Sequence, residues 1–415
     1  MYLLKIFIFV ETLLIFLIAI KKNKDLFSPV KFYLLFSIFF YIKIYFNEVQ
    51  GETLICYFLL IQIVGICALI ENNLPSKVNI SNISSLFLEK VLWILTFPSL
   101  IIICYYIYDA GGLLEYLGIL ASRVKVWSGQ GPLTMVINWM PTLNLVYFSY
   151  IILNKDNSLL KKLRYGLHFV LFIIIGLLTA SRSNIGICIL GMIFVWGYVN
   201  GRPKIQNIIF VAFLLVAFAG FMGGVRNTYG VGMSFDSLVN SLTGSEFESA
   251  QLGYGIDPLE VIFTAPEKPP ILGSTYLTLA TNLIPRHFWP NKPDTGGIIF
   301  TKEYTDDQSG LSYYATGAIT EGIMNFGQTA GLFFGICEIL VFFMSGSLAY
   351  NKYFFKGIKN GKSLNILFVI GFYYAILSFS RISYGEFTDV FQALLIFNLL
   401  PLVLISFCSR FKSAA

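Results

Sequence analysis

Residues 284–297, IPRHFWPNKPDTGG, gather an unusual set of polar side chains in a chain that is only 13% charged. The set comprises Arg286, His287, Trp289, Lys292 and Asp294, and His287 is one of only two histidines. A guanidinium binds phosphate and an imidazole can move a proton near neutral pH. An arginine and a histidine flanked by aromatic rings would suit a sugar that is attached to a phosphate.

The same run has a simpler interpretation, an interfacial belt without chemistry. Phe288 and Trp289 are residue types that collect at the boundary between water and lipid. The preceding stretch, GSTYLTLATNLI, predicts an amphipathic helix on the outer surface, ended by Pro285. Its apolar residues at helical spacing are Tyr276, Ala280, Leu283 and Ile284.

Other arginines lie near the ends of apolar segments. Arg182 opens a helix in LLTASRSNIGI, where free backbone N–H groups add to the guanidinium in binding phosphate. Arg226 and Arg381 follow further apolar segments, and Arg286 belongs to the run described above. Arginine grips phosphate through a bidentate fork, so these residues predict a pocket for an anionic headgroup. Arginines that simply anchor helix ends at the interface are the alternative.

The elements that carry these residues are hydrophobic. The chain has 415 residues, 56% of them hydrophobic, with a mean hydropathy of +0.72, whereas soluble domains are about 25% charged. Apolar runs long enough to cross a bilayer recur at 3–20, 30–46, 52–70, 91–108, 132–153, 165–178, 184–199, 205–223, 321–346, 363–380 and 388–408. We expect an all-α polytopic membrane protein with about eleven transmembrane helices. A single membrane domain would cover 1–415, with a long, partly helical loop at 224–320 between helices 8 and 9.

Lysine placement predicts the orientation. Alternate loops on one side hold most of the 29 lysine and arginine residues, and arginine exceeds lysine only on the other side. The positive-inside rule makes the lysine-rich side cytoplasmic, so the N-terminus and loop 224–320 lie outside and the C-terminus inside. The net charge of +6 belongs to the inner face and requires no nucleic-acid partner.

Motifs for other chemistries are missing from the sequence. There is no GxxxxGK[ST] phosphate loop, HExxH or CxxC. Asp306 and Asp307 lack a third ligand, so we expect neither a metal nor another cofactor. His168 would lie about 21 Å of helix from Arg182, which predicts a packing role.

The stretches STYLTLATNLIPRHFWPNKPDTGG and TEGIMNFGQTAGLFFG resemble the bacterial Wzy family, the oligosaccharide repeat-unit (O-antigen) polymerases. The matched features are Pro285-Arg286, Trp289, Lys292-Pro293 and the pattern Glu321/Asn325-Phe326-Gly327/Gly331. Arg286 and Gly297 also fit the Arg-x10-Gly spacing of an outer loop in such enzymes. Arg182 and Arg226 have no matching glycine, so a second copy of that motif is missing.

This resemblance implies a GT-C-like glycosyltransferase arrangement in the bacterial inner membrane. Such enzymes move a glycan from undecaprenyl pyrophosphate to a sugar hydroxyl of a second lipid-linked repeat unit, in O-antigen or capsule synthesis. Its partners would be that lipid-linked oligosaccharide, membrane lipid and a chain-length-regulating co-polymerase. Arg182, Arg226, Arg286 and Arg381 would bind pyrophosphate, and Trp289 and Asn325 would bind sugar.

The acceptor hydroxyl needs a base, for which Glu321 and His287 are the candidates. We expect Glu321 to begin helix 321–346 and to stay ionised well below pH 5, which favours it slightly. Glu338 would lie about 25 Å further down the same helix, away from the chemistry.

Two other functions remain open. An O-antigen ligase or another polyprenyl-phosphate glycosyltransferase would share the donor. A lipid-linked oligosaccharide flippase or transporter would place ionisable residues at the bilayer midplane and use broken helices.

Overall fold

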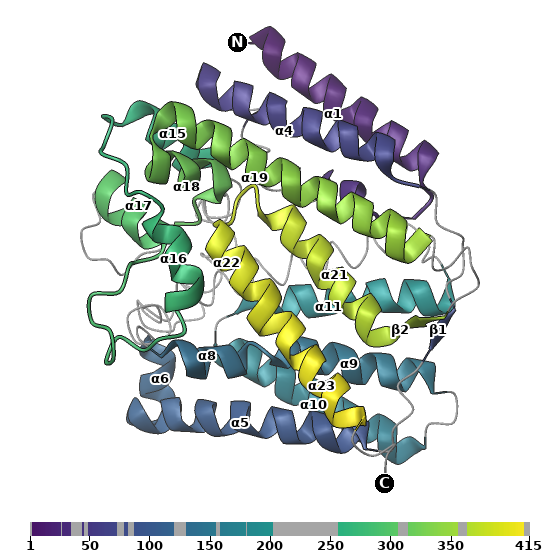
Figure 1. Ribbon diagram of the computed structural model, residues 1–415. Coiled ribbons are helices and arrows are strands. Elements are labelled where there is room, and N and C mark those ends of the chain that lie inside the picture. The colour runs from purple at the N-terminus through teal and green to yellow at the C-terminus, as the bar shows by residue number, and fades with distance from the viewer. Residues whose placement is uncertain are drawn as a thin grey trace, which may run out of the picture. The chain divides into compact units, whose positions relative to one another are not determined.

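The computed structural model is mostly helical over the residues that it describes (Figure 1). It describes residues 2–25, 27–34, 44, 49–72, 79–81, 87–119, 130–154, 158–179, 181–201, 256–305, 314–355 and 363–410. Contacts divide the chain into two compact units. The first unit comprises Met1–Ser76, Ser249–Gly361 and Tyr374–Leu394, and the second comprises Lys77–Glu248, Lys362–Tyr373 and Leu395–Ala415.

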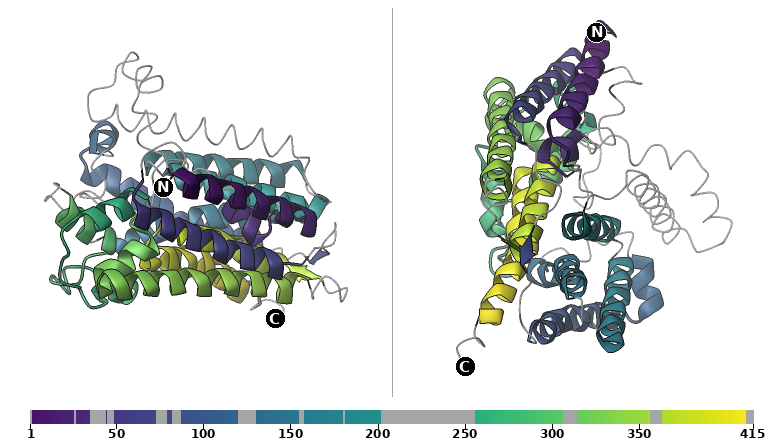
Figure 2. Two further views of the ribbon diagram at one scale, coloured as in Figure 1. Left: turned by 90° about the horizontal axis from the view of Figure 1, so that it is seen from above. Right: turned by 90° about the vertical axis from the view of Figure 1, so that its right-hand side faces the viewer.

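The first unit is built on three long helices that lie side by side (Figures 1 and 2). Helix α4 (Gly51–Ile70) packs against α1 (Tyr2–Lys22) on one side and α19 (Gln328–Ala349) on the other. The apolar core between them includes Leu54, Ile61 and Phe343. The shorter elements are α15 (Ile256–Thr264), α16 (Ser274–Thr281), α17 (Gly296–Tyr304), α18 (Gly317–Phe326), the π-helical turn η2 (Tyr350–Phe355) and α22 (Phe387–Gln392).

The second unit is centred on α9 (Met140–Leu153), which packs against α5 (Leu88–Asp109), α10 (Leu159–Leu178) and α11 (Arg182–Asn200). It also holds α6 (Leu113–Ile119), α8 (Gly131–Ile137), α23 (Leu400–Arg410) and a short parallel pair, β1 (Ile80–Ser81) with β2 (Leu364–Asn365). Helix α21 (Ile366–Arg381) and the π-helical η3 (Ala393–Leu399) each pass from one unit to the other.

His168 confirms its predicted packing role in the second unit. The side chain is fully buried, and its ring nitrogens lie 2.9 Å from Thr96 Oγ1 and 3.2 Å from Asn144 Oδ1. The rings of Trp93 and Tyr147 pack edge-on against it. Both polar atoms are therefore satisfied inside the helix packing.

The described residues include seven spans that are long and apolar enough to cross a membrane, so the chain has the character of a multi-pass membrane protein. They are Tyr2–Lys22, Gly51–Ile70, Leu88–Asp109, Gly131–Leu153, Ser183–Asn200, Gln328–Tyr353 and Phe387–Ser409. Ile366–Arg381 is a shorter apolar helix, and α10 covers the predicted segment 165–178. Of the two remaining predicted segments, 205–223 lies wholly and 30–46 mostly outside the described residues, so the count of eleven stays a prediction.

The predicted continuous helix 321–346 is wrong. The chain breaks at Gly327, whose φ of 80° suits glycine, and α18 folds back along α19. A Cβ added to Gly335 would lie 2.6 Å from Ile319 Cα, and one added to Gly331 would collide with the backbone of Gly322. These glycines let the two helices contact each other backbone to backbone, which a sequence of apolar residues alone does not reveal.

Candidate functional site

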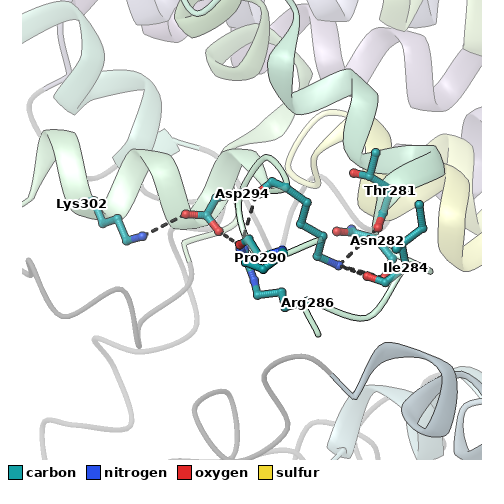
Figure 3. Close-up of polar contacts among 8 residues, drawn as sticks. Thr281, Asn282, Ile284, Arg286, Pro290, Asp294 and Lys302 are labelled. Atoms are coloured by element: carbon teal, nitrogen blue, oxygen red, sulfur yellow. Dashed lines mark hydrogen bonds and ion pairs between the residues drawn. The ribbon is translucent and has the colours of Figure 1, made fainter. Parts of the chain in front are cut away.

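The run 284–294 folds into a closed loop around Arg286. The Arg286 guanidinium donates to Pro290 O at 3.1 Å, to Lys292 O at 3.3 Å and to the Asp294 carboxylate (Figure 3). Asp294 also accepts from Lys302 Nζ at 2.9 Å. Since a guanidinium has five N–H groups, these bonds fix its position and leave donors for a ligand.

Lys292 closes the other side of this loop. Its ammonium donates to three carbonyl oxygens at the end of α16: those of Thr281 at 3.2 Å, Asn282 at 3.2 Å and Ile284 at 2.8 Å (Figure 3). A cation at a helix C-terminus satisfies orphan carbonyls and the helix dipole. Partial burial lowers the pKa of Lys292, and the neighbouring Arg286 charge lowers it further. Helix α16 therefore ends at Thr281, four residues before the predicted stop at Pro285.

Helix α16 is amphipathic, but its buried face differs from the expected one. Its threonines Thr275, Thr278 and Thr281 are buried, whereas Leu277 and the following Ile284 are exposed. Tyr276, expected on the same face as Ile284, instead packs among Phe326, Phe334 and Phe387. The helix thus turns its polar side inward and its leucine outward, the arrangement of a segment whose outer surroundings are apolar.

The closed loop presents its aromatic tip outward. His287 is exposed, and its ring lies 5.4 Å from that of Phe288. Phe288 is 77% exposed and Trp289 is 42% exposed. The structure therefore brings Arg286, His287 and Trp289 together in one loop, as the sequence predicts, with the ring-bearing side chains accessible.

Glu321 lies in a different setting from the one predicted. It is the fifth residue of α18, fully buried, and accepts from Thr275 Oγ1 and from the backbone N–H of Phe387, both at 2.7 Å. Burial raises the pKa of Glu321 to about 7, although these two hydrogen bonds oppose the shift. The expectation that Glu321 stays ionised well below pH 5 is wrong, because the carboxyl group is removed from water.

Asn325 supports Glu321. Its amide Nδ2 donates to Thr275 Oγ1 at 2.8 Å and to the backbone oxygen of Glu321 at 2.7 Å. The side chain is fully buried. In this structure Asn325 ties α18 to α16, and its assignment to sugar binding stays a prediction.

Glu338 also belongs to this region, contrary to the expected separation of about 25 Å along one helix. Because α18 folds back at Gly327, α19 carries Glu338 to within 3.4 Å of Tyr276 Oη on α16. Burial raises the pKa of Tyr276, and the charges of Glu338 and Glu321 raise it further. The charges of two acidic side chains therefore raise the pKa of one tyrosine, and one of them also accepts its hydrogen bond.

Glu386 is a site residue that sequence reasoning missed. It precedes α22, is fully buried, and its carboxylate accepts from the backbone N–H of Gly297 in α17. A Cβ on Gly296 would lie 3.2 Å from this carboxylate. The paired glycines at 296–297 were the available signal, since adjacent glycines at a helix start permit close approach of another group.

Of the other three arginines predicted to bind pyrophosphate, the structure describes two, Arg182 and Arg381. Arg381 ends α21, as predicted, and forms an ion pair with Asp389 at 3.2 Å. Its turn lies beside the middle of α19, where Phe342 packs on Phe379, Phe387 and Phe391. Arg182 begins α11 after Ser181, whose side chain makes no capping bond. Arg226 lies outside the described residues, as do Asp306 and Asp307.

In comparisons with known proteins, no family model, curated protein or solved structure matches the chain.

Proposed function

We propose that this chain is a membrane-embedded polymerase of lipid-linked oligosaccharide repeat units. It transfers a growing glycan from undecaprenyl pyrophosphate to a sugar hydroxyl of a new lipid-linked repeat unit. The reaction takes place on the periplasmic side of the bacterial inner membrane, with the N-terminus periplasmic and the C-terminus cytoplasmic. The helices adopt a GT-C-like arrangement, and a co-polymerase that regulates chain length is the expected protein partner.

One observation carries the proposal: the loop 284–294 is locked by its own charges and presents Arg286, His287 and Trp289 together. These residues lie in the stretch that resembles the Wzy family. A preorganised guanidinium stabilises the negative charge that develops on a departing pyrophosphate. Next to it stand an imidazole and an indole ring, which suit a sugar held close to that phosphate.

The outward leucine and isoleucine of the preceding segment support the location of this loop. Leu277 is 61% exposed and Ile284 is 37% exposed, and both are suited to the lipid boundary. Aromatic tips at that depth contact headgroups. A substrate whose lipid tail stays in the bilayer would thus meet the loop without leaving the membrane.

The geometry favours His287 over Glu321 as the base. Both Glu321 carboxylate oxygens accept hydrogen bonds inside the protein, and the side chain has no exposed surface. A general base must reach the proton that it removes, which the exposed His287 can do. Glu321 then acts as the support that holds α16 and α22 in place, which reverses the preference drawn from the sequence.

The test is polymerisation of purified lipid-linked repeat units by the purified protein without nucleotide sugar. We expect Arg286→Ala to reduce polymer at least about 100-fold, since each charge-assisted bond is worth about 1.5–3 kcal/mol. Arg286→Lys should rescue poorly, because lysine lacks the planar fork. Arg164→Ala is the matched control, since Arg164 also pairs with a carboxylate, that of Glu89 at 3.3 Å, but lies in the second unit.

Two results would contradict the proposal. One is a wild-type protein that binds repeat units and forms no polymer under any condition. The other is an Arg286→Ala variant with the activity of Arg164→Ala. We also expect EDTA to leave activity intact; loss in EDTA with recovery in magnesium would require metal ligands that this proposal does not contain.

A transporter of lipid-linked oligosaccharide is the second candidate, favoured by two observations. The membrane-spanning α19 carries a largely enclosed acid, Glu338, and the chain is broken at Gly327 just before it. Ionisable residues within spans and broken helices are typical of transporters. Reconstituted vesicles separate the two functions, because a transporter moves repeat units between leaflets without lengthening them.

A further inference from the structure

Two buried glutamates of the first unit each bind the N-terminus of a helix other than their own. Glu321 of α18 accepts from the N–H of Phe387, the first residue of α22. Glu386 occupies the N-cap position of α22 but makes no capping bond to that helix, and accepts from Gly297 N–H in α17 instead. Helices α18, α22 and α17 are therefore joined in series by carboxylates at helix N-termini, where negative charge is favourable.

Helix α17 connects this series to the Arg286 loop. Asp294 lies two residues before α17 and binds both Arg286 and Lys302, the latter a residue of α17 itself. The N-cap residue Thr295 makes no side-chain capping bond. Glu386 thus supplies a contact to the start of α17 that the helix's own cap does not make.

The Glu386 carboxylate approaches the backbone of α17 closely at Gly296. A Cβ on Gly296 would lie 3.2 Å from both Cδ and Oε2 of Glu386 and 3.5 Å from Met324. An added methyl group would therefore push the carboxylate away from Gly297. Glycine at 296 lets the carboxylate approach Gly297 without this displacement, which a side chain at 296 would force by a few tenths of an ångström.

We propose that Glu386 is a positioning residue that sets the Arg286 loop through α17. Its carboxylate fixes the first turn of α17, the first turn places Asp294, and Asp294 aligns the Arg286 guanidinium. The effect on catalysis rests on the proposed function, because it requires that Arg286 binds the pyrophosphate. The effect of Glu386 on the position of the loop does not depend on the proposed function.

The first experiment measures the loop without using activity. Trypsin cleaves after Arg286 only when the loop opens, and the fragment that starts at His287 can be followed by mass spectrometry. We expect Glu386→Gln and Gly296→Ala, in folded detergent-purified protein, to raise this cleavage rate at least about tenfold, because proteolysis tracks the open population. Combining both changes should add little, since they disrupt one contact.

Glu71→Gln is the matched control. Glu71 is also buried, and it also accepts from a backbone N–H, that of Val30 at 2.9 Å, in a contact that involves neither α17 nor the loop. Its cleavage rate after Arg286 should stay within about twofold of wild type, since surfaces away from the change keep their opening equilibrium. Wild-type cleavage in Glu386→Gln and Gly296→Ala, or equal acceleration in Glu71→Gln, would overturn the proposal. If Glu386→Gln does not fold, Gly296→Ala alone decides the outcome.

The second experiment uses polymer formation. A positioning role predicts that Glu386→Gln lowers kcat/KM for the lipid-linked donor at least about fivefold and raises the KM, because Arg286 binds the pyrophosphate both in the bound donor and as it departs. A general loss of fold would reduce the amount of active protein and leave KM unchanged, which would contradict the positioning role. If the wild-type protein forms no polymer, the proposed function fails while the trypsin result still stands.

Discussion

Two regions of the first unit bind the unpaired backbone groups at helix ends with side chains of opposite charge. At the surface, the Lys292 ammonium satisfies the carbonyl end of α16. In the interior, the Glu386 and Glu321 carboxylates satisfy the N–H ends of α17 and α22. Both follow the helix dipole, but water can replace the lysine and cannot reach the glutamates. The buried contacts are therefore suited to holding the helices in fixed positions, and the exposed loop is suited to binding a ligand.

The largest effect should come from removing the interior acceptor. Glu321→Ala removes the acceptor of the Thr275 hydroxyl and of the Phe387 N–H, and each buried unpaired donor costs about 1–3 kcal/mol. We expect a loss of about 2–4 kcal/mol in the free energy of unfolding, measured by detergent titration. Glu303→Ala, a change at an exposed glutamate of α17, should cost less than about 0.5 kcal/mol. Equal losses would mean that burial does not separate the two regions.

The same residue should make stability depend on pH. Burial raises the pKa of Glu321 to about 7 in the folded protein, above its ordinary value of 4.5. Its contribution is therefore complete below pH 4.5 and is lost as pH rises through 7. Melting curves between pH 4.5 and 8 should show a fall in wild-type stability that is weaker in Glu321→Gln. An identical pH dependence in the variant would assign the fall to other groups.

A smaller effect is expected at the exposed region. Lys292→Met removes the partner of three carbonyls, which water then hydrates, so the cost should be about 1 kcal/mol. Hydrogen exchange of peptides covering 283–292 should become faster, since the loop opens more often. Lys162→Met, at an exposed lysine of α10, should leave that exchange unchanged. No change in Lys292→Met would show that the loop does not depend on its own charges.

The smallest effect on stability should come from the loop tip. His287→Gln should change the free energy of unfolding by less than about 0.5 kcal/mol, because the side chain is exposed, while polymer formation falls strongly. His168→Gln should show the reverse, since His168 is bound to Thr96 and Asn144 in the core. Full activity in His287→Gln with none in a folded Glu321→Gln would return the base to Glu321.

The sequence predicted the features that depend on composition and period. Long apolar runs located α1, α4, α5 and α11 closely, since hydrophobicity over about 20 residues is the signal for a span. The cluster Arg286, His287 and Trp289 was also found, because residues this close in sequence remain close in space. The packing role of His168 followed from its position along α10, far from the turn that precedes Arg182.

The sequence did not predict the features that depend on long-range approach. The fold-back at Gly327 rests on contacts between the glycines of α18 and α19, which apolar periodicity does not encode. Because this fold-back was not predicted, Glu338 was expected far from the site, and Glu321 was expected at a helix start instead of in the core. Glu386 was missed because its partner, Gly297, is 89 residues away and is bound through a backbone N–H that any residue type carries.

The fold-back at Gly327 also constrains the order in which the protein can be made. Helix α18 has 10 residues, about 15 Å of helix, which is half of a bilayer core of about 30 Å. It carries Glu321 and Asn325, and the hydrocarbon core tolerates such groups only when they are paired. A nascent α18 is therefore too short to cross the membrane by itself, and its contacts with α19 can form only after α19 has been synthesised behind it. The hydrogen bond that Glu321 accepts from the Phe387 N–H forms later still, because Phe387 lies further along the chain.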